Sequence, residues 1–465
     1  MKRGRNLAVA MALCMMLATA GYAAVTDMAE ERQPDVEALP AQSQLLLTLE
    51  RAIEIALADN PTIQIAEQDV QLKEQAKLET TMGLLPEANL SGSYQRTIEK
   101  QTMVMNNTQF KVGVNNMYSG GLSISLPVFA PALYKSMNLT RTDVEMAVES
   151  ARASKQDLVC QVTKAFYQLM LAQDSYAVLQ KSLAQSEENF RIVAAKYKEG
   201  RVSEYDKISA EVQMRNLQPS VISARNAVDL SKLQLKVLMG VTADVDVAVE
   251  GNLKDYEEQM YASMLTTDSL SLSRNSSLMQ MDLNSRLLQN TLAIQNTNFM
   301  PNVALQFNYM FTCMADNFDF ANYKWNPYAN VALSFSIPLF KYSNFSTVKK
   351  TRLQMNQLQL NRDYAERQLR MQMNTYLNNM TASAEQVSSN KEAIIQAQKG
   401  RDIAQTLYDV GRGTVLELNS AEVALTQSEL TYSQSVFDWL TAKADLDKLV
   451  GVDYDIENEK NKNEE

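Results

Sequence analysis

Residues 301–311 read PNVALQFNYMF, and apolar and polar side chains alternate after the proline. The odd-numbered positions from Val303 to Phe311 are all apolar, whereas the even-numbered positions 302–308 hold Asn, Ala, Gln and Asn. A period of two is typical of a β-strand with one apolar face. Because about ten residues is the length of a tilted strand that crosses a bilayer, we expect a transmembrane strand here.

Three other short segments have the same character. Residues 330–337 alternate before Pro338, and the first half of the chain has similar pieces after Pro86 and before Pro127. Four such strands are not stable alone in lipid, because open sheet edges leave backbone N–H and C=O groups without hydrogen bonds. Two chains would give eight strands with a nearly filled interior, whereas three give twelve strands and a lumen. We therefore expect a trimeric β-barrel.

The rest of the chain is predicted to be helical. Only 14 Gly and 10 Pro occur in 465 residues, about 5% against about 12% in average usage. Four segments lack both residue types and are free to form helices: 132–199, 252–300, 339–399 and 414–450. A helix over 132–199 would be about 100 Å long at 1.5 Å per residue.

Two heptad series run through the last of these segments. Their members are Leu418, Leu425, Tyr432, Trp439 and Leu446 in the first series and Leu416, Val423, Leu430 and Phe437 in the second. Series offset by two residues lie about 200° apart around a helix, so each face needs its own neighbouring helix. A sheet of helices closed into a tube satisfies this requirement, whereas a two-stranded coiled coil does not.

The chain also repeats itself. Pro86 corresponds to Pro301 at a separation of 215, and four further matches occur at a separation of 211. They pair Pro127-Val128-Phe129 with Pro338-Leu339-Phe340, Tyr197 with Tyr408, Gly200 with Gly411, and Gly240-Val241 with Gly451-Val452. We expect one unit of helix, strand, strand, long helix and helix to occur twice.

This pattern divides the chain into six parts. The first 23 residues combine early basic side chains with an apolar run and Gly21-Tyr22-Ala23, as in a cleaved secretory signal peptide. The apolar run has about 14 residues, too few to cross a bilayer as a helix. The other parts are a linker at 24–44, the first repeat at 45–241, a polar connector at 242–273, the second repeat at 274–452 and a disordered acidic tail at 453–465.

The composition of the chain argues against a catalytic function. Histidine is absent, which removes imidazole triads, imidazole metal sites and ordinary imidazole acid–base catalysis. The net charge of −10 is spread along the chain and provides no basic face for nucleic acid. Cys160 and Cys313, the two cysteines of the mature chain, are expected to be inert thiols. We expect no enzyme activity, no cofactor and no metal site.

The signal peptide, the duplicated unit, the proline-containing strand ends and the two Tyr-x-x-Gly turns together resemble the TolC-like outer-membrane efflux proteins. The resemblance covers about residues 45–452. It implies a mainly α fold with a transmembrane β part: a homotrimer with a twelve-strand β-barrel in outer-membrane lipid and a twelve-helix α-barrel in the periplasm. It also implies drug efflux or type I protein secretion together with a periplasmic adaptor and an inner-membrane pump.

The resemblance assigns roles to two turns. Gly200 and Arg201 in the first turn, with Gly411 and Gly413 in the second, fall where adaptor hairpins dock on the family's periplasmic tip. Glycine also permits the positive φ of a helix C-cap, so a purely structural role is the simpler alternative.

The same match suggests an aperture and a gate. Glu417 and Ser420 fall where the family has acidic residues around the closed aperture, so a trimer would carry a ring of three Glu417 carboxylates. A solvated acid on a helix is the alternative interpretation. Asp206 and Tyr408 match residues that hold the tip shut, and Arg412 lies one residue before the position of the family's basic partner.

Three interpretations stay open at this stage. Pro219 either kinks the helix expected over 203–240 or breaks it. Tyr323, Trp325 and Tyr328 form either an interfacial aromatic belt or the packing of an external loop. The competing function is a non-conducting structural coiled-coil protein of the cell envelope, although the strands and the Gln/Asn-rich stretch 354–398 favour a water-lined tube.

Overall fold

The computed structural model describes residues 45–105, 108–242, 245–249, 251–257, 260, 271–319 and 322–454. The predicted signal peptide, the linker at 24–44 and residues 455–465 of the predicted tail lie outside the described residues.

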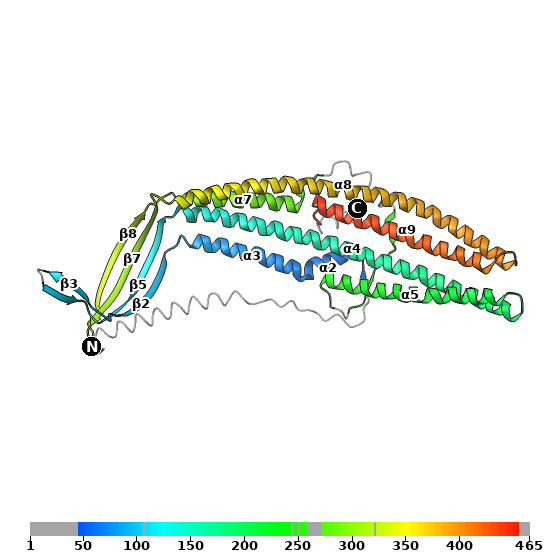
Figure 1. Cartoon of the computed structure of the whole chain (residues 1–465), viewed down its shortest axis with the longest axis horizontal. Coiled ribbons are helices and arrows are strands. Elements are labelled where there is room, and N and C mark those ends of the chain that lie inside the picture. The colour runs from blue at the N-terminus through cyan, green and yellow to red at the C-terminus, as the bar shows by residue number, and fades with distance from the viewer. Residues whose placement is uncertain are drawn as a thin grey trace. The chain divides into compact units, whose positions relative to one another are not determined.

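The main elements occur twice in the same order (Figure 1). The first set consists of α3 (Pro61–Met82), β2 (Glu87–Arg96), β5 (Asn116–Phe129), α4 (Pro131–Lys198) and α5 (Glu204–Met239). The second set consists of α7 (Ser276–Thr297), β7 (Asn302–Ala315), β8 (Asn326–Ser336), α8 (Tyr342–Asp409) and α9 (Val415–Val450). The expected duplication of helix, strand, strand, long helix and helix is confirmed.

Smaller elements surround the junction of the two sets. They are α2 (Leu49–Asp59), a parallel pair of β1 (Leu45–Leu47) with β6 (Val247–Val249), and the short helices η1 (Leu253–Tyr256) and η3 (Leu272–Arg274). Of the segment 252–300, which lacks Gly and Pro, only α7 is an α-helix of more than one turn among the described residues, and it begins at Ser276. Asn275 caps it by accepting the Leu278 N–H at 3.1 Å. Absence of Gly and Pro permits a helix but does not require one.

The four predicted strands form one antiparallel sheet in the order β2-β5-β7-β8. Cross-strand partners such as Leu90, Leu122 and Tyr309 place the apolar side chains on one face, and Ser and Asn side chains dominate the other. One edge of β2 and one edge of β8 have no strand beside them among the described residues. A hairpin of β3 (Gln101–Met105) and β4 (Thr108–Val112) connects β2 to β5. Among the described helices, none has the length and apolarity needed to cross a bilayer.

The aromatic residues near β8 divide between the two faces of the sheet. The Tyr323 hydroxyl lies 3.3 Å from that of Tyr118, whose ring stacks on Tyr94 at 4.8 Å on the apolar face. Tyr328 instead pairs with Met310 on the polar face. The interpretation that Tyr328 belongs to an interfacial aromatic belt is therefore wrong, because the period of two of the strand turns its side chain away from the apolar face.

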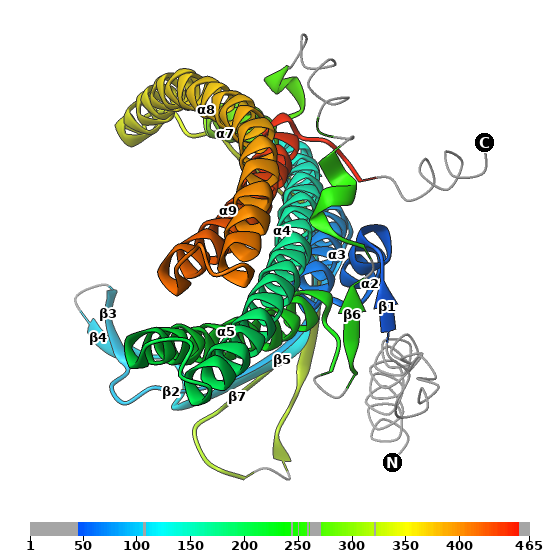
Figure 2. The same ribbon diagram turned by 90° about the vertical axis from the view of Figure 1, so that its right-hand side faces the viewer.

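The two 68-residue helices, α4 and α8, determine the length of the helical part, about 100 Å each. Next to the sheet the neighbours run α3, α4, α7, α8, and farther away they run α5, α4, α9, α8 (Figures 1 and 2). Helix α5 continues through Pro219 without a break. Its exposed position lets solvent satisfy the carbonyl that loses its N–H partner.

The two heptad series of α9 have different surroundings. The first series is buried against the other helices, with Trp439 at 1% exposure in the main core. In the second series, Leu416 and Val423 are at least half exposed within one chain. One seam is therefore filled by the chain's own helices and the other, at the end near the turns, has no partner among the described residues.

Glycine at the end of each set is required by close packing. Gly451 ends α9 with φ 80°, and a Cβ there would overlap the Arg274 carbonyl oxygen. Gly451→Ala should therefore destabilise the fold by about 2 kcal/mol or more, from backbone strain and overpacking. The thermal midpoint followed by far-UV circular dichroism should fall.

Gly400→Ala is the matched control for this experiment. Gly400 lies inside α8, and a Cβ at this position would have no atom within 4 Å apart from the backbone of its own helix. Alanine should therefore raise the midpoint through its higher helix propensity. Equal midpoints for the two variants would contradict the packing argument.

Candidate functional site

Two tight turns lie at the end of the helices farthest from the sheet (Figure 1). The first turn, residues 199–203, joins α4 to α5, and the second turn, residues 410–414, joins α8 to α9. Gly200 and Gly411 follow the two C-caps in the left-handed conformation, with φ 72° and 76°. A Cβ would be strained at this φ, so glycine makes both reversals possible.

Both turns close with the same hydrogen bonds. The Arg201 N–H donates to the Lys196 carbonyl at 2.9 Å, and the Arg412 N–H donates to the Leu407 carbonyl at 2.9 Å. These bonds, with those from Gly200 and Gly411, complete a Schellman motif and satisfy carbonyls at the helix end. In the second turn Gly413 adds a third N–H, also bonded to Leu407, so this turn is more tightly closed.

The helices that leave the turns begin with equivalent capping boxes. Asp206 accepts the Ser203 N–H at 3.1 Å, and Glu417 accepts the Thr414 N–H at 2.9 Å. Each N-cap hydroxyl accepts the N–H of the acid in return. The predicted gate acid and the predicted aperture acid therefore occupy the same structural position in the two repeats. A Ser/Thr-x-x-acid pattern at a helix start was the sequence signal for this role.

A small apolar cluster joins the two helical hairpins at this end. Its buried members come from α4, α5, α8 and the start of α9, and they are Val193, Ala210, Tyr408, Val415 and Leu418. We call this group the tip cluster. Tyr408 is only 6% exposed, and the Lys196 ammonium lies 4.2 Å from the centre of its ring. The Tyr408 hydroxyl is buried and has no hydrogen-bond partner among the described residues.

The predicted gate residues come together only in part. Burial raises the pKa of Tyr408, and the nearby charge of Asp206 adds to the shift. The Asp206 carboxylate bonds to Ser203, however, and no hydrogen bond links it to Tyr408 in the described part of the chain. Arg412 is exposed at the second turn. Glu417 and Ser420 are both exposed and lie one turn apart on α9.

A buried polar contact above the tip cluster had no counterpart in the sequence analysis. Asn189 of α4 donates to Glu422 of α9 at 2.6 Å, and Glu422 is only 6% exposed. Burial raises the pKa of Glu422, while the Asn189 bond and the charge of Arg401 partly oppose that shift. A contact between residues 233 positions apart leaves no local pattern, so only the structure reveals it.

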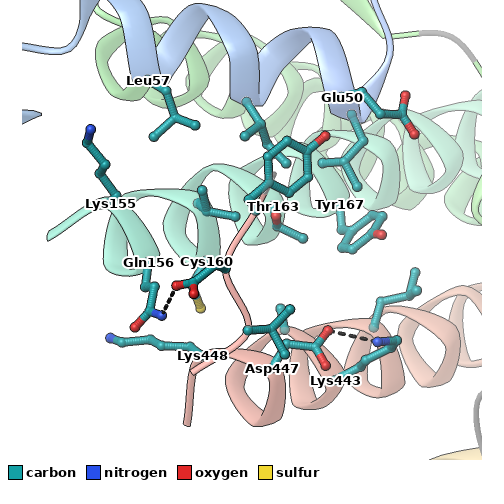
Figure 3. Close-up of a pocket in the computed structure, with 18 of the residues that line it drawn as sticks. Glu50, Leu57, Lys155, Gln156, Cys160, Thr163, Tyr167, Lys443, Asp447 and Lys448 are labelled. Atoms are coloured by element: carbon teal, nitrogen blue, oxygen red, sulfur yellow. Dashed lines mark hydrogen bonds and ion pairs between the residues drawn. The ribbon is translucent and has the colours of Figure 1, made fainter. Parts of the chain in front are cut away.

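One pocket in the described part of the chain lies away from the turns. It has a volume of about 860 Å³ and lies between α2, α4 and α9 (Figure 3). Several charged groups on its wall are paired, as in the 2.7 Å contact of Lys443 with Asp447. Burial raises the pKa of Cys160 to about 11, so this thiol stays protonated at neutral pH, as expected of an inert cysteine.

Comparison with known proteins gives one family. The family model described as outer membrane efflux protein matches residues 52–241 and 269–452. Outer membrane protein TolC of Escherichia coli is 21% identical over 433 residues, which cover 86% of this chain and 85% of that protein. The TolC protein of Vibrio cholerae is 18% identical over 378 residues, covering 79% and 82%.

Solved structures share the fold at lower identity. The CmeC outer membrane channel of Campylobacter jejuni has a TM-score of 0.69 at 14% identity and covers 89% of this chain and 88% of its own. The open state of the MtrE outer membrane channel of Neisseria gonorrhoeae also has a TM-score of 0.69, at 15% identity, covering 91% and 97%. These likenesses establish the fold of the chain, from the sheet to the helical turns.

The buried carboxyl of Glu422 leads to a pH prediction. Because its folded pKa is raised, its contribution to stability is fully present below the usual glutamate pKa and is lost as pH rises through the folded value. Glu422→Gln keeps an oxygen that accepts the Asn189 bond and cannot ionise. The variant should melt at a higher temperature than the native protein at neutral pH, and this difference in melting temperature should vanish at about pH 4.

Glu417→Gln is the control with the opposite sign. Hydrogen bonds from the Thr414 backbone and side chain lower the pKa of Glu417, so its contribution is present above the usual pKa and is lost as pH falls through the folded value. This variant should melt below the native protein at neutral pH and converge with it in acid. If both variants shifted the melting temperature at neutral pH in the same direction, the opposite pKa shifts assigned to Glu422 and Glu417 would be ruled out.

Proposed function

Because the chain belongs to the outer membrane efflux protein family, we propose that three copies form a passive exit duct that carries substrates through the periplasm and across the outer membrane. Each copy contributes four strands to a closed barrel and four helices at each level of the tube. The adaptor and inner-membrane pump select the cargo and supply the energy, so efflux of small molecules and secretion of a polypeptide use the same duct.

The observation that carries this proposal is the single-layer sheet with two different faces and two open edges. Its apolar face suits lipid and its polar face suits water. The outer edges of β2 and β8 have no strand partner in the part of the chain that the structure describes, and could pair between copies. The exposed second seam of α9, with Leu416 at 58% exposure, provides a matching surface in the helical part. A fibre-forming envelope protein would need the helices but would have no use for amphipathic strands.

The turns form the periplasmic end of the proposed duct. Gly200, Arg201, Gly411 and Gly413 present two rigid helix reversals to an adaptor hairpin. Glu417 and Ser420 face the aperture, where three carboxylates in a narrow opening favour cations over anions. Asp206, Tyr408 and Arg412 control its width. For Asp206 and Tyr408 the support is that Tyr408 belongs to the tip cluster and that the charge of Asp206 lies close enough to raise the Tyr408 pKa.

Ion selectivity tests the duct and its aperture together. Purified trimers in planar bilayers should conduct, with cations preferred, and Glu417→Gln should reduce that preference. Thr414→Ala is the matched control, because it removes the N-cap of the same helix at a cost of about 1 kcal/mol but keeps the charge. Trimers without conductance in any condition would overturn the duct, whereas equal selectivity in both variants would overturn only the aperture role.

The duplication supplies a matched pair for the gate. Tyr408→Ala removes a ring buried in the tip cluster and should cost about 3 kcal/mol of packing, so the resting conductance should rise severalfold. Tyr197, its equivalent in the first repeat, is 37% exposed, and Tyr197→Ala should change the conductance little. The prediction fails if the two alanine variants open equally.

A further inference from the structure

The polar face of the sheet is built in levels, one for every second residue of a strand. The three levels farthest from the helices are set by the strand register and contain neutral residues only. From the outermost level inward they hold Gln95, Met117 and Met314; then Ser93, Ser119, Thr312 and Asn326; then Ser91, Gly121, Met310 and Tyr328. Levels nearer the helices carry Asn, Ser, Gln and Ala, together with Pro127 and with Glu87 at one edge.

Three methionines interrupt this polar surface at its outer end. Met117 and Met314 are direct cross-strand partners in the outermost level. Met310 lies two levels below, opposite Gly121 on one side and Tyr328 on the other. We call Met117, Met310 and Met314 the methionine patch.

The neighbours of Met310 keep its side chain on this face. A Cβ on Gly121 would lie 2.3 Å from the Tyr309 carbonyl oxygen and 2.8 Å from the Met310 Cγ, so glycine here permits the close approach of β5 to the backbone of β7 and leaves space beside the Met310 side chain. From the other side, the Tyr328 hydroxyl donates a hydrogen bond to the Met310 sulfur at 3.2 Å. Both neighbouring strands therefore accommodate this methionine.

Core packing does not explain the patch. Methionine is an adaptable filler of buried gaps, but this sheet has a single layer and Met314 is 59% exposed. A twelve-strand barrel is also too wide for side chains to fill. Apolar, polarisable side chains thus lie on a surface where Ser, Thr, Asn and Gln would be expected.

We propose that the methionine patch is a contact site for cargo that carries apolar aromatic rings, at the point where the cargo leaves the duct. The inference rests on the proposed function, because it requires the polar face to line the lumen. Thioethers pack favourably against aromatic rings, and the three outer levels contain no charge that would hold such molecules by another means. In an assembly of three copies, nine thioethers would surround the exit.

Block of ionic current tests the site. Tetraphenylphosphonium carries four aromatic rings and one positive charge, whereas tetraethylammonium carries the charge without rings. Added to native trimers in planar bilayers, the aromatic cation should interrupt the current at lower concentration. The triple variant Met117→Gln, Met310→Gln, Met314→Gln should weaken that block about tenfold, from the loss of several sulfur–aromatic contacts, and should leave the tetraethylammonium response unchanged.

A second triple variant controls for the loss of thioethers elsewhere. This variant combines Met82→Gln, Met300→Gln and Met371→Gln, which replace three exposed methionines outside the sheet. Tetraphenylphosphonium should block its current at the same concentration as in the native protein. If the patch variant does not assemble, Met314→Gln alone alters an exposed side chain and should weaken the block in the same direction. If tetraphenylphosphonium blocks the patch variant and the native protein equally, the methionine patch is not the contact site. The proposed duct still stands in that case, because the native trimers conduct. Absence of native conductance overturns the duct itself.

Discussion

Backbone hydrogen bonding at the edges of one sheet is the constraint on which the rest of the structure depends. In lipid, an N–H or C=O group without a partner costs several kcal/mol, and each edge strand of the four-strand sheet carries a row of such groups. One chain cannot close this sheet, since β2 and β8 lie at opposite ends of its order. Pairing β8 of one copy with β2 of the next satisfies both edges and needs no further element.

The helices extend the same logic into water. Each long helix continues from a strand with only a short connection, β5 into α4 and β8 into α8. The spacing of the strands around the barrel therefore sets where the long helices start. The shorter helices fill the gaps between them, α3 and α7 beside the sheet and α5 and α9 beside the turns. A two-seamed helix such as α9 is what a closed ring of helices requires, because every member has a neighbour on both sides.

Periodicity explains why the fold was predictable to this extent. Strands such as β7 alternate with a period of two, and α9 repeats with a period of seven, so each pattern determines both the element and its buried face. The candidate site could be predicted from the sequence only in part. The capping boxes of Asp206 and Glu417 have a local sequence pattern, a Ser or Thr three residues before the acid, although the sequence assigned these acids only to the gate and the aperture. The bond of Asn189 to Glu422 joins distant segments and leaves no periodic trace.

Duplicated sequence does not produce two identical turns. Tyr408 is buried in the tip cluster beneath Lys196, whereas its equivalent Tyr197 is partly exposed, with the Lys207 ammonium 5.3 Å from its ring centre. Because only the second turn sends its tyrosine between the hairpins, the two turns present different side chains to their surroundings. In the proposed ring of three copies, the two kinds of turn would alternate. In the proposed assembly, an adaptor at these turns would therefore meet two different turns in each copy, and not six equivalent ones.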